Sequence, residues 1–254
     1  MIKKNKDEVS IILPVYNSKL FIKRTLKSVK NQSYKNWKLF IIDDYSSDNT
    51  SSILKNFKKK NKKKVFLYAN KINKGQSFSR NLAILKSRSK YIAFLDSDDF
   101  WHKNKLKKQI DFMKKEKIKF SYTNYIVLAK KNKKIILKKK TDYKTFLTNS
   151  SIPTSSIVLD RSVIKNIKFP NKIRICEDYY FKSKILMKNT AYNINKFLLS
   201  YRIRNKSLQS NRLKALMTIF LINKKFNNLN IFQNLNSLFR ISLNSIKKFG
   251  LFRN

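Results

Sequence analysis

Short apolar runs that end in clustered carboxylates are the feature of this sequence that most restricts its fold. Residues 39–42 lead into Asp43-Asp44, and residues 91–95 lead into three aspartates within 96–99. Short β-rich apolar runs of this kind are typical of buried parallel strands. Carboxylates at the carboxyl ends of such strands converge where open α/β sheets bind ligands. Because neighbouring carboxylates repel each other, a counter-ion is a natural reason to keep them together.

These clusters stand out because acidic residues are scarce. The 254 residues contain 59 Lys plus Arg and 14 Asp plus Glu, for a net charge of +45. Seven of the 14 acidic residues fall in three clusters, at 43–44, 96–99 and 177–178. A helix cap or a solvated turn is the competing explanation for each cluster. The same explanation applies to Asp48, which follows the first cluster, and it stays open most of all for that residue. A cap needs one oxygen, however, so the cluster at 96–99 indicates a binding site.

The order of apolar patterns predicts the fold class. Strands are predicted at 9–15, 37–42, 65–68 and 91–95, with a helix after each. The first helix is expected to turn Leu20, Phe21, Leu26 and Val29 to one face. This alternation predicts an α/β fold with a Rossmann-type β-α-β sheet.

The second half of the chain has a different pattern. A hairpin is predicted over 121–137, a short strand over 155–159, a helix over 178–187 and a strand over 197–203. From Arg212 onward the pattern is helical, and Leu213, Leu216 and Ile219 are spaced for one apolar face.

Several classes of protein are excluded by composition. The chain has two glycines, Gly75 and Gly250, so it lacks the usual dinucleotide fingerprint and the phosphate-binding P-loop. One cysteine, Cys176, excludes an internal disulfide and fits a reducing compartment. One histidine, His102, leaves no His-rich metal site. Because no apolar signal segment or bilayer-long apolar run is found, we expect a cytoplasmic protein that is soluble or peripheral on the inner face of the plasma membrane.

The large positive charge has two open explanations. Lys, Asn, Ile and Phe are abundant while Gly, Ala, Pro and Arg are scarce. This pattern is expected from drift toward AT-rich codons, in which case the charge says nothing about binding partners. Alternatively, the charge attracts anionic lipid headgroups or a phosphate-bearing substrate. Basic patches also bind nucleic acid non-specifically, but no nucleic-acid motif accompanies the charge, so no specific nucleic-acid partner is expected.

Five segments follow one another between Val9 and Ser210. They read SIILPVYN at 10–17, IDDYSSD at 42–48, NKG and SRN within 73–81, FLDSDD at 94–99, and TSS and CEDY at 154–156 and 176–179. In this order they resemble the motifs of family 2 glycosyltransferases, whose GT-A fold is a Rossmann-like three-layer α/β/α sandwich. The resemblance implies a catalytic domain over residues 1–210, followed by a basic amphipathic helical extension over 211–254.

The same resemblance implies a donor site. The nucleotide-sugar would be bound by Pro14, Tyr16, Asn17, Asp44, Gly75, Arg80, Asp96 and Arg204. Pro14 and Tyr16 would flank the base, and Asp44 would hydrogen-bond the base or the ribose. Asp98 would bind a divalent cation, Mn²⁺ or Mg²⁺, with Asp96 contacting the ribose or the metal site, because hard oxygen ligands suit a cation that bridges a diphosphate.

Three of these residues have a competing explanation. Tyr16 could be a core aromatic, and Arg80 could pair with Asp43 instead of facing phosphates. Gly75 could be an ordinary turn glycine, although a glycine in so glycine-poor a chain is expected to need its backbone freedom. Its place at a predicted helix start suits close approach of a phosphate or sugar.

The resemblance places the acceptor chemistry at Glu177 and Asp178. Asp178 would be the catalytic base that takes the proton from the acceptor hydroxyl, and Glu177 would orient it or the acceptor. The competing explanation is that acidic residues favour a helix N-terminus. Arg204 departs from the family pattern, since relatives commonly have histidine there. Arginine does not ligate cations but fits phosphate oxygens, which leaves the coordination and the necessity of the metal open.

Together these features imply an inverting, metal-dependent transferase. It would move a sugar from a nucleotide-diphosphate donor to a glycan or lipid-linked acceptor in cell-surface polysaccharide synthesis. The basic C-terminal helices could lie on an anionic membrane surface or simply pack on the catalytic core. The alternative is a catalytically decayed basic protein of the same fold that binds membrane or nucleic acid. The retained Asp98 and Asp178 argue against it, and Arg204 mildly supports it.

Overall fold

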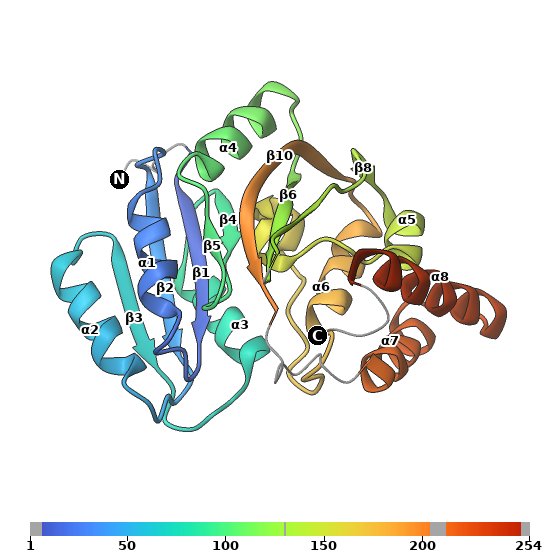
Figure 1. Cartoon of the computed structure of the whole chain (residues 1–254), viewed down its shortest axis with the longest axis horizontal. Coiled ribbons are helices and arrows are strands. Elements are labelled where there is room, and N and C mark those ends of the chain that lie inside the picture. Colours follow the sequence, from blue (N-terminus) through green and yellow to red (C-terminus); the bar gives the residue numbers. More distant parts are fainter. Residues whose placement is uncertain (1–6, 130, 204–211, 250–254) are drawn as a thin grey trace.

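A mixed ten-stranded β-sheet runs through the computed structural model, which describes residues 7–129, 131–203 and 212–249 (Figure 1). The strands are β1 (Val9–Val15), β2 (Trp37–Asp43), β3 (Val65–Ala69), β4 (Tyr91–Phe94), β5 (Phe100–Trp101), β6 (Phe120–Leu128), β7 (Lys133–Ile135), β8 (Lys140–Thr141), β9 (Val158–Asp160) and β10 (Ala191–Arg202). Their order is β3-β2-β1-β4-β9-β6-β10-β5, with β7 beside β6 and β8 beside β10.

Helices cover both faces of this sheet. They are α1 (Ile22–Lys30), α2 (Thr50–Lys60), α3 (Gln76–Lys86), α4 (Lys105–Lys115), α5 (Tyr143–Thr148), α6 (Glu177–Leu186), α7 (Arg212–Phe226) and α8 (Ile231–Phe249), with short 3₁₀ turns at Thr154–Ser156 and Arg161–Ile164. Parallel crossovers are right-handed as a rule, and with this strand order the rule puts α1 and α2 on one face and α3 on the other. The predicted α/β class and the layers of helix, sheet and helix are therefore confirmed.

The strand order sets the position of a ligand site. The chain runs from β1 outward to β2 and β3, and then returns to place β4 on the other side of β1. β1 is parallel to both β2 and β4, so their carboxyl ends lie at one edge. Ligands bind in open α/β sheets at such a switch point, beyond the carboxyl ends of the strands.

The core explains why these runs form strands. Every residue of β1 and β4 is buried, as expected for parallel strands covered on both faces. In α1, Ile22, Leu26 and Val29 face this core. Leu20 does not, because α1 begins two residues after it and its side chain is 78% exposed; the prediction that it shares the buried face is wrong.

The C-terminal helices are fixed to the rest of the protein by a buried polar network. Asn223 of α7 accepts a hydrogen bond from the Tyr179 hydroxyl at 2.8 Å and donates to Asn234 Oδ1 at 3.1 Å and Ser237 Oγ at 3.2 Å on α8. Satisfied buried networks of this kind favour one arrangement over others. The predicted domain boundary after residue 210 lies outside the described residues, as does Arg204.

Only one face of α7 and α8 is used for this packing. Leu213 is 81% exposed and Phe232 is 80% exposed, although the sequence pattern placed Leu213 on the same apolar face as the buried Ile219. Within the described part of the chain, no helix has the length and apolar character required to cross a bilayer. The two helices thus combine an inner face against the core with an outer apolar face.

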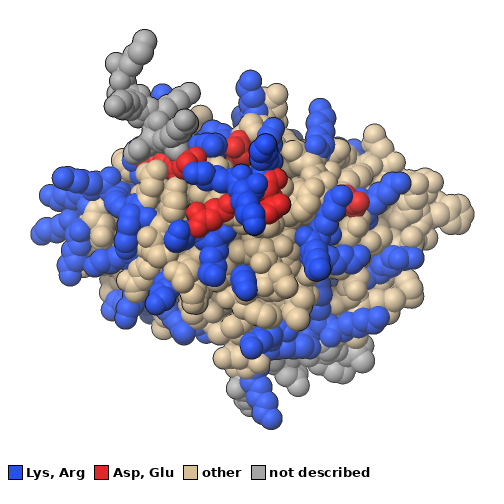
Figure 2. All heavy atoms as spheres, turned by 90° about the horizontal axis from the view of Figure 1, so that it is seen from above, with Lys and Arg blue, Asp and Glu red and all other residues tan. Residues whose placement is uncertain are grey.

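Basic side chains are spread widely over the surface. Figure 2 shows Lys and Arg over much of one face, with a few acidic side chains among them. Such scatter fits the compositional explanation for much of the charge, because a docking surface would concentrate the charge in one place.

Candidate active site

A cavity of about 670 Å³ opens at the switch point between β1 and β4. Its lining includes Pro14, Tyr16, Asn17, Asp44, Gly75, Asp96 and Asp98. These residues come from the ends of three neighbouring strands and the start of α3. The structure therefore brings together the predicted donor-binding residues that it describes, apart from Arg80. The Arg80 side chain pairs with Asp96 and lines the next cavity.

Tyr16 is presented to this cavity. Its side chain is 47% exposed, while the preceding Val15 is buried. The alternative explanation of Tyr16 as a core aromatic is therefore wrong. An exposed ring at the mouth of a cavity provides a flat surface on which a nucleotide base can stack.

Asp44 holds the loop that leads into α3. Its carboxylate accepts hydrogen bonds from the backbone N–H groups of Lys74 at 2.9 Å and Gly75 at 2.8 Å, and from the Asn70 amide at 2.6 Å. Gly75 has φ +89° and ψ 163°, a region of backbone conformation that is almost restricted to glycine. The predicted need for glycine at position 75 is confirmed, and Asp44 fixes the loop as well as lining the cavity.

The other acids of the second segment stabilise the local structure. Asp43 accepts a hydrogen bond from Ser46 N at 3.1 Å and one from the Ser51 hydroxyl. Asp48 accepts from Thr50 N at 3.0 Å and Lys19 N at 3.2 Å. Asp48 thus closes a turn before α2, as the competing explanation for this residue predicted.

Three aspartates follow β4, and two of them form the acidic side of the cavity. Asp96 and Asp98 line it, while Asp99 is buried and accepts a hydrogen bond from Arg202 N at 2.9 Å. Burial, reinforced by the charges of Asp98 and Asp96, raises the pKa of the Asp99 carboxyl well above its usual range. This repulsion is what a divalent cation beside Asp96 and Asp98 would relieve.

The oxygen ligands available here fit Mg²⁺ or Mn²⁺. Within the described ranges, no group of three or more His, Cys, Asp or Glu side chains could enclose a metal ion. Magnesium is commonly held by one or two carboxylates together with substrate phosphates and water. Asp96 and Asp98 can supply the protein share of such a site, and a diphosphate in the cavity would complete it.

Arg80 joins Asp96, at the first cavity, to a second acidic pair, Glu177 and Asp178. Its buried guanidinium donates to Asp96 Oδ1 at 2.7 Å and to Glu177 Oε1 at 2.8 Å. The guanidinium also lies over the Phe169 ring, 5.0 Å from its centroid. The alternative of a pair with Asp43 is wrong, because the carboxylates that contact Arg80 belong to the end of β4 and the start of α6.

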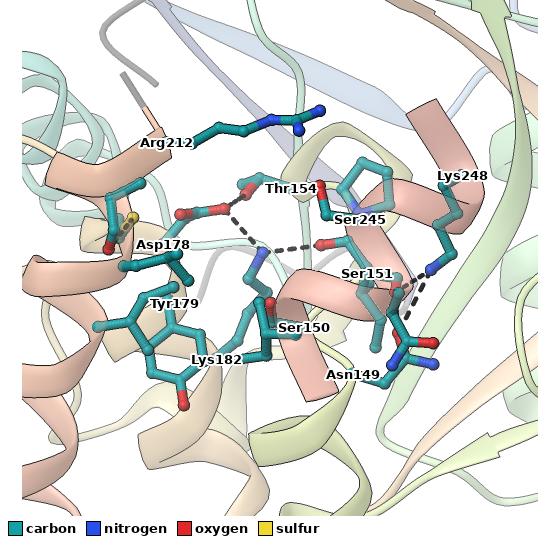
Figure 3. A pocket seen from close by; sticks show the side chains of 18 of the residues that line it. Asn149, Ser150, Ser151, Thr154, Asp178, Tyr179, Lys182, Arg212, Ser245 and Lys248 are labelled. Carbon is teal, nitrogen blue, oxygen red and sulfur yellow. Dashed lines mark hydrogen bonds and ion pairs between the residues drawn. The ribbon is translucent and has the colours of Figure 1, made fainter. Parts of the chain in front are cut away.

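A second cavity, of about 580 Å³, contains Asp178 (Figure 3). Asp96, Glu177, Gln76 and Tyr201 line both cavities, so the two are neighbours. Asp178 Oδ2 accepts hydrogen bonds from the Thr154 hydroxyl at 3.0 Å and from Lys182 Nζ at 2.7 Å. The walls are completed by residues 149–154 and by α7 and α8.

Lys182 keeps Asp178 ionised. Burial acts to raise the pKa of the Asp178 carboxyl, but the Lys182 ammonium, with help from Arg80, outweighs burial and lowers it. The adjacent Glu177 behaves differently: burial raises its pKa to about 7, even though Arg80 opposes the change. Asp178 is thus a carboxylate at neutral pH and can accept a proton.

The sequence did not lead us to predict two polar side chains that contact the carboxylates of the site, Lys182 at Asp178 and Gln76 at Asp96. Lys182 lies four residues after Asp178 on α6, a spacing that permits an ion pair on a helix and could have identified it. Gln76 donates to Asp96 Oδ1 at 3.1 Å across 20 residues, and no local spacing indicates that contact. Thr154 begins the TSS segment that carries part of the family resemblance, but its hydrogen bond to Asp178 was not predicted.

Solved structures with the same fold are known. The chain superimposes on Staphylococcus aureus TarS (residues 1–349) in complex with UDP-GlcNAc with a TM-score of 0.75 at 19% identity, covering 94% of this chain and 73% of that one. It also matches the mannosyltransferase PcManGT of Pyrobaculum calidifontis, in complex with GDP-Man and Mn²⁺, with a TM-score of 0.70 at 14% identity over 94% and 73% of the two chains. At these identities the likeness establishes the fold.

Sequence relatives establish the family. The chain is 34% identical to TuaG of Bacillus subtilis (strain 168), whose name assigns it to teichuronic acid biosynthesis, over 96% of this chain and 98% of that protein. It is 38% identical, over 82% of each chain, to WfgD of Escherichia coli, named as a UDP-Glc:α-D-GlcNAc-diphosphoundecaprenol β-1,3-glucosyltransferase. The model of glycosyl transferase family 2 matches residues 10–168. With the switch-point cavity and these matches, the chain belongs to glycosyl transferase family 2.

Proposed function

We propose that this glycosyltransferase moves a hexose from a UDP-sugar to a lipid-linked sugar diphosphate, with inversion at the anomeric carbon. The printed name of WfgD, with UDP-Glc as donor and a diphosphoundecaprenol-linked sugar as acceptor, supports both substrate classes. TuaG, which matches nearly the whole chain, supports a role in cell-surface polysaccharide synthesis.

One observation carries the proposal: Asp178, paired with Lys182 at 2.7 Å, lies in a cavity that adjoins the proposed donor cavity. An acceptor hydroxyl bound at Asp178 would give its proton to the carboxylate as its oxygen forms a bond to the anomeric carbon. The bond from that carbon to the diphosphate oxygen breaks, and its electron pair leaves with UDP. Attack from the side opposite the leaving group inverts the configuration.

Asp98 and Asp96 are the residues that would hold Mn²⁺ or Mg²⁺. When bound, such an ion neutralises the charge that develops on the departing diphosphate. Arg80 fixes Asp96 through a 2.7 Å ion pair, so the orientation of this carboxylate is set before the donor arrives. Pro14 and Tyr16 remain proposed contacts of the base, and Asn17 and Arg204 remain proposed contacts of the nucleotide-sugar.

The test combines transfer with donor binding. Asp178→Asn should lower the transfer of glucose from UDP-Glc to a GlcNAc-diphosphate-lipid by roughly 100-fold or more, while calorimetry shows nearly unchanged affinity for UDP-Glc. Asp111→Asn is the matched control, because Asp111 belongs to an exposed salt bridge with Lys107 on α4. It should leave both the transfer rate and the affinity for UDP-Glc unchanged. Collapse of donor affinity in Asp178→Asn would place Asp178 in the donor site and refute its role as base.

We further propose that the outer face of α7 and α8 rests on an anionic bilayer, on the inner side of the plasma membrane. Leu213, Met217 and Leu221 follow one another at four-residue intervals on α7, and all are exposed. On α8 the exposed large apolar residues are Ile231, Phe232, Leu235, Phe239 and Leu243. The four-residue spacing places the exposed apolar residues of α7 on one side of that helix, and large exposed apolar patches are unusual for a monomer.

Charge favours a lipid surface over a second copy of the chain as the occupant of this face. Residues 179–254 contain no Asp or Glu, and α7 and α8 carry exposed Lys214, Lys224, Lys225 and Arg240. Two copies of this face would therefore repel each other. An anionic surface would attract it, with about 1 kcal/mol for each nearby basic residue.

Vesicle binding tests this surface. Phe232→Ser combined with Phe239→Ser should release the protein from phosphatidylglycerol vesicles at low salt, whereas Leu20→Ser, at an equally exposed site before α1, should not. If the double variant still sediments, the contact lies in the lysine runs at 58–64 or 130–140. If neither protein binds vesicles and light scattering shows a dimer, the face is an interface between copies.

A further inference from the structure

The cavity around Asp178 continues to a group of polar side chains that the proposed transfer step does not use. Lys248, Asn149 and Ser151 lie on the side of the cavity opposite Asp178 (Figure 3). Lys248 Nζ donates to Asn149 Oδ1 at 3.3 Å and to the Ser151 hydroxyl. The hydroxyl of Ser245 also lines this side.

Lys248 is a half-buried cation, and the side chains that its ammonium contacts in the described part of the chain, Asn149 and Ser151, are both neutral. The carboxylates that line the cavity are Asp96, Glu177 and Asp178, and each of them is paired with Arg80 or Lys182. The chain has no acidic residue after Asp178, so neither α7 nor α8 can provide one. Burial without a counter-charge lowers the pKa of Lys248 to about 8.

The two sides of the cavity therefore have opposite chemistry. The side at Asp178 presents a proton acceptor suited to a sugar hydroxyl. The side at Lys248 presents an ammonium, an amide and hydroxyl groups. Phosphate oxygens can accept hydrogen bonds from all of these groups. An anion placed there would supply the counter-charge that Lys248 lacks.

We infer that the Lys248 side of this cavity binds a phosphate group of the acceptor, with Ser151 and Ser245 as further donors, while the acceptor sugar reaches Asp178. The inference rests on the proposed function, because it takes the acceptor to be a lipid-linked sugar diphosphate. It also gives α8 two roles, since the helix that exposes Phe232 and Phe239 to the bilayer would carry Lys248 to the diphosphate of a lipid anchored in the same bilayer.

Chemical protection of Lys248 tests the site without any turnover. The full chain is treated with a low level of acetic anhydride, and acetylation of Lys248 and of the neighbouring exposed Lys247 is measured by peptide mass spectrometry. GlcNAc-diphosphate with a short alkyl chain should protect Lys248 by about tenfold and leave Lys247 unchanged. Protection by phosphatidylglycerol vesicles but not by this compound would assign Lys248 to lipid headgroups and overturn the inference.

Kinetics then test the acceptor role. Lys248→Met should raise KM for the GlcNAc-diphosphate acceptor by about 10- to 100-fold, as expected for loss of a hydrogen bond to a charged group. KM for an alkyl GlcNAc glycoside without phosphate and KM for UDP-Glc should not change. Lys248→Arg should retain most of the discrimination, and Lys247→Met should behave as wild type.

The outcomes separate this inference from the proposed function. Equal effects of Lys248→Met on both acceptors would show a structural role for Lys248 and overturn the inference, even if transfer occurs as proposed. If the wild type transfers glucose to neither acceptor, the proposed substrates are wrong, and the protection experiment still decides whether the phosphate site exists. Absence of protection by the sugar diphosphate refutes the site in either case.

Discussion

In the proposed mechanism, Lys182 sets the pH range in which Asp178 can act as a base. Its Nζ lies 2.7 Å from Asp178 Oδ2 and stabilises the carboxylate, so its removal favours the protonated acid. An opposite charge at this distance commonly lowers a carboxyl pKa by about 1–3 units. In Lys182→Met we therefore expect the acid limb of the pH–kcat profile to move upward by about 1–3 pH units, because a protonated Asp178 cannot accept the acceptor's proton.

The upward shift of the acid limb determines how the rate of Lys182→Met compares with that of the wild type at each pH. Below the new pKa, each pH unit costs the variant about tenfold in rate, whereas at high pH Asp178 is ionised again and the rate should approach that of the wild type. Lys182 also donates to the Ile152 carbonyl at 2.7 Å, and an unpaired buried carbonyl costs roughly 1–3 kcal/mol of stability. The assay is therefore run well below the unfolding temperature of the variant.

A matched control separates charge at the base from charge in general. Lys188 is exposed just beyond the end of α6, so Lys188→Met removes the same charge without contacting Asp178 and should leave the profile in place. If Lys182→Met lowers kcat by the same factor at every pH, its ammonium does not control the protonation of Asp178, and the electrostatic reasoning is refuted.

Three further changes test other parts of the site and the fold. Asp98→Asn should abolish the dependence of donor hydrolysis on added Mn²⁺ or Mg²⁺ together with most of the activity; full activity in excess chelator would contradict a metal at Asp98. Gly75→Ala should cost about 1–3 kcal/mol in denaturant unfolding, because alanine is strained at φ +89° although no heavy atom lies within 4 Å of the added Cβ; an unchanged midpoint would show that the loop relaxes. Asn223→Ala should destabilise the protein by about 1–3 kcal/mol, whereas the exposed Asn236→Ala should stay within about 0.5 kcal/mol.

The parts of the fold that depend on local pattern were predictable from the sequence. Buried parallel strands have near-continuous apolar runs, and β1, β2 and β4 were predicted within one residue at each end. Once these strands were predicted to be parallel, the meeting of Asp44 and Asp96 at one edge followed from the geometry of α/β sheets. Gly75 was predictable because a glycine-poor chain keeps glycine where the backbone requires it.

Contacts that depend on packing between distant segments were not predictable in the same way. Arg80 and Glu177 are 97 residues apart in sequence and form a 2.8 Å ion pair, but nothing in the spacing of either residue selects the other. Leu20 and Leu213 fit an apolar period and are nevertheless exposed. A helical period identifies residues on one face, whereas the position of the helix end and of the neighbouring elements decides whether that face is covered.

The choice between Glu177 and Asp178 as base likewise depends on the folded protein. The two are neighbours in sequence, yet burial raises the pKa of Glu177 from 4.5 to about 7, while Lys182 lowers that of Asp178. Glu177 therefore binds more protons in the folded state than in the unfolded state between pH 4.5 and about 7, so its contribution to stability falls as the pH rises through that window. Asp178 stays ionised through the same range. Environments that push the pKa values of adjacent carboxyls apart give them different roles. In the proposed mechanism Asp178 takes the acceptor's proton, whereas Glu177 pairs with Arg80, which also pairs with Asp96 at the end of β4.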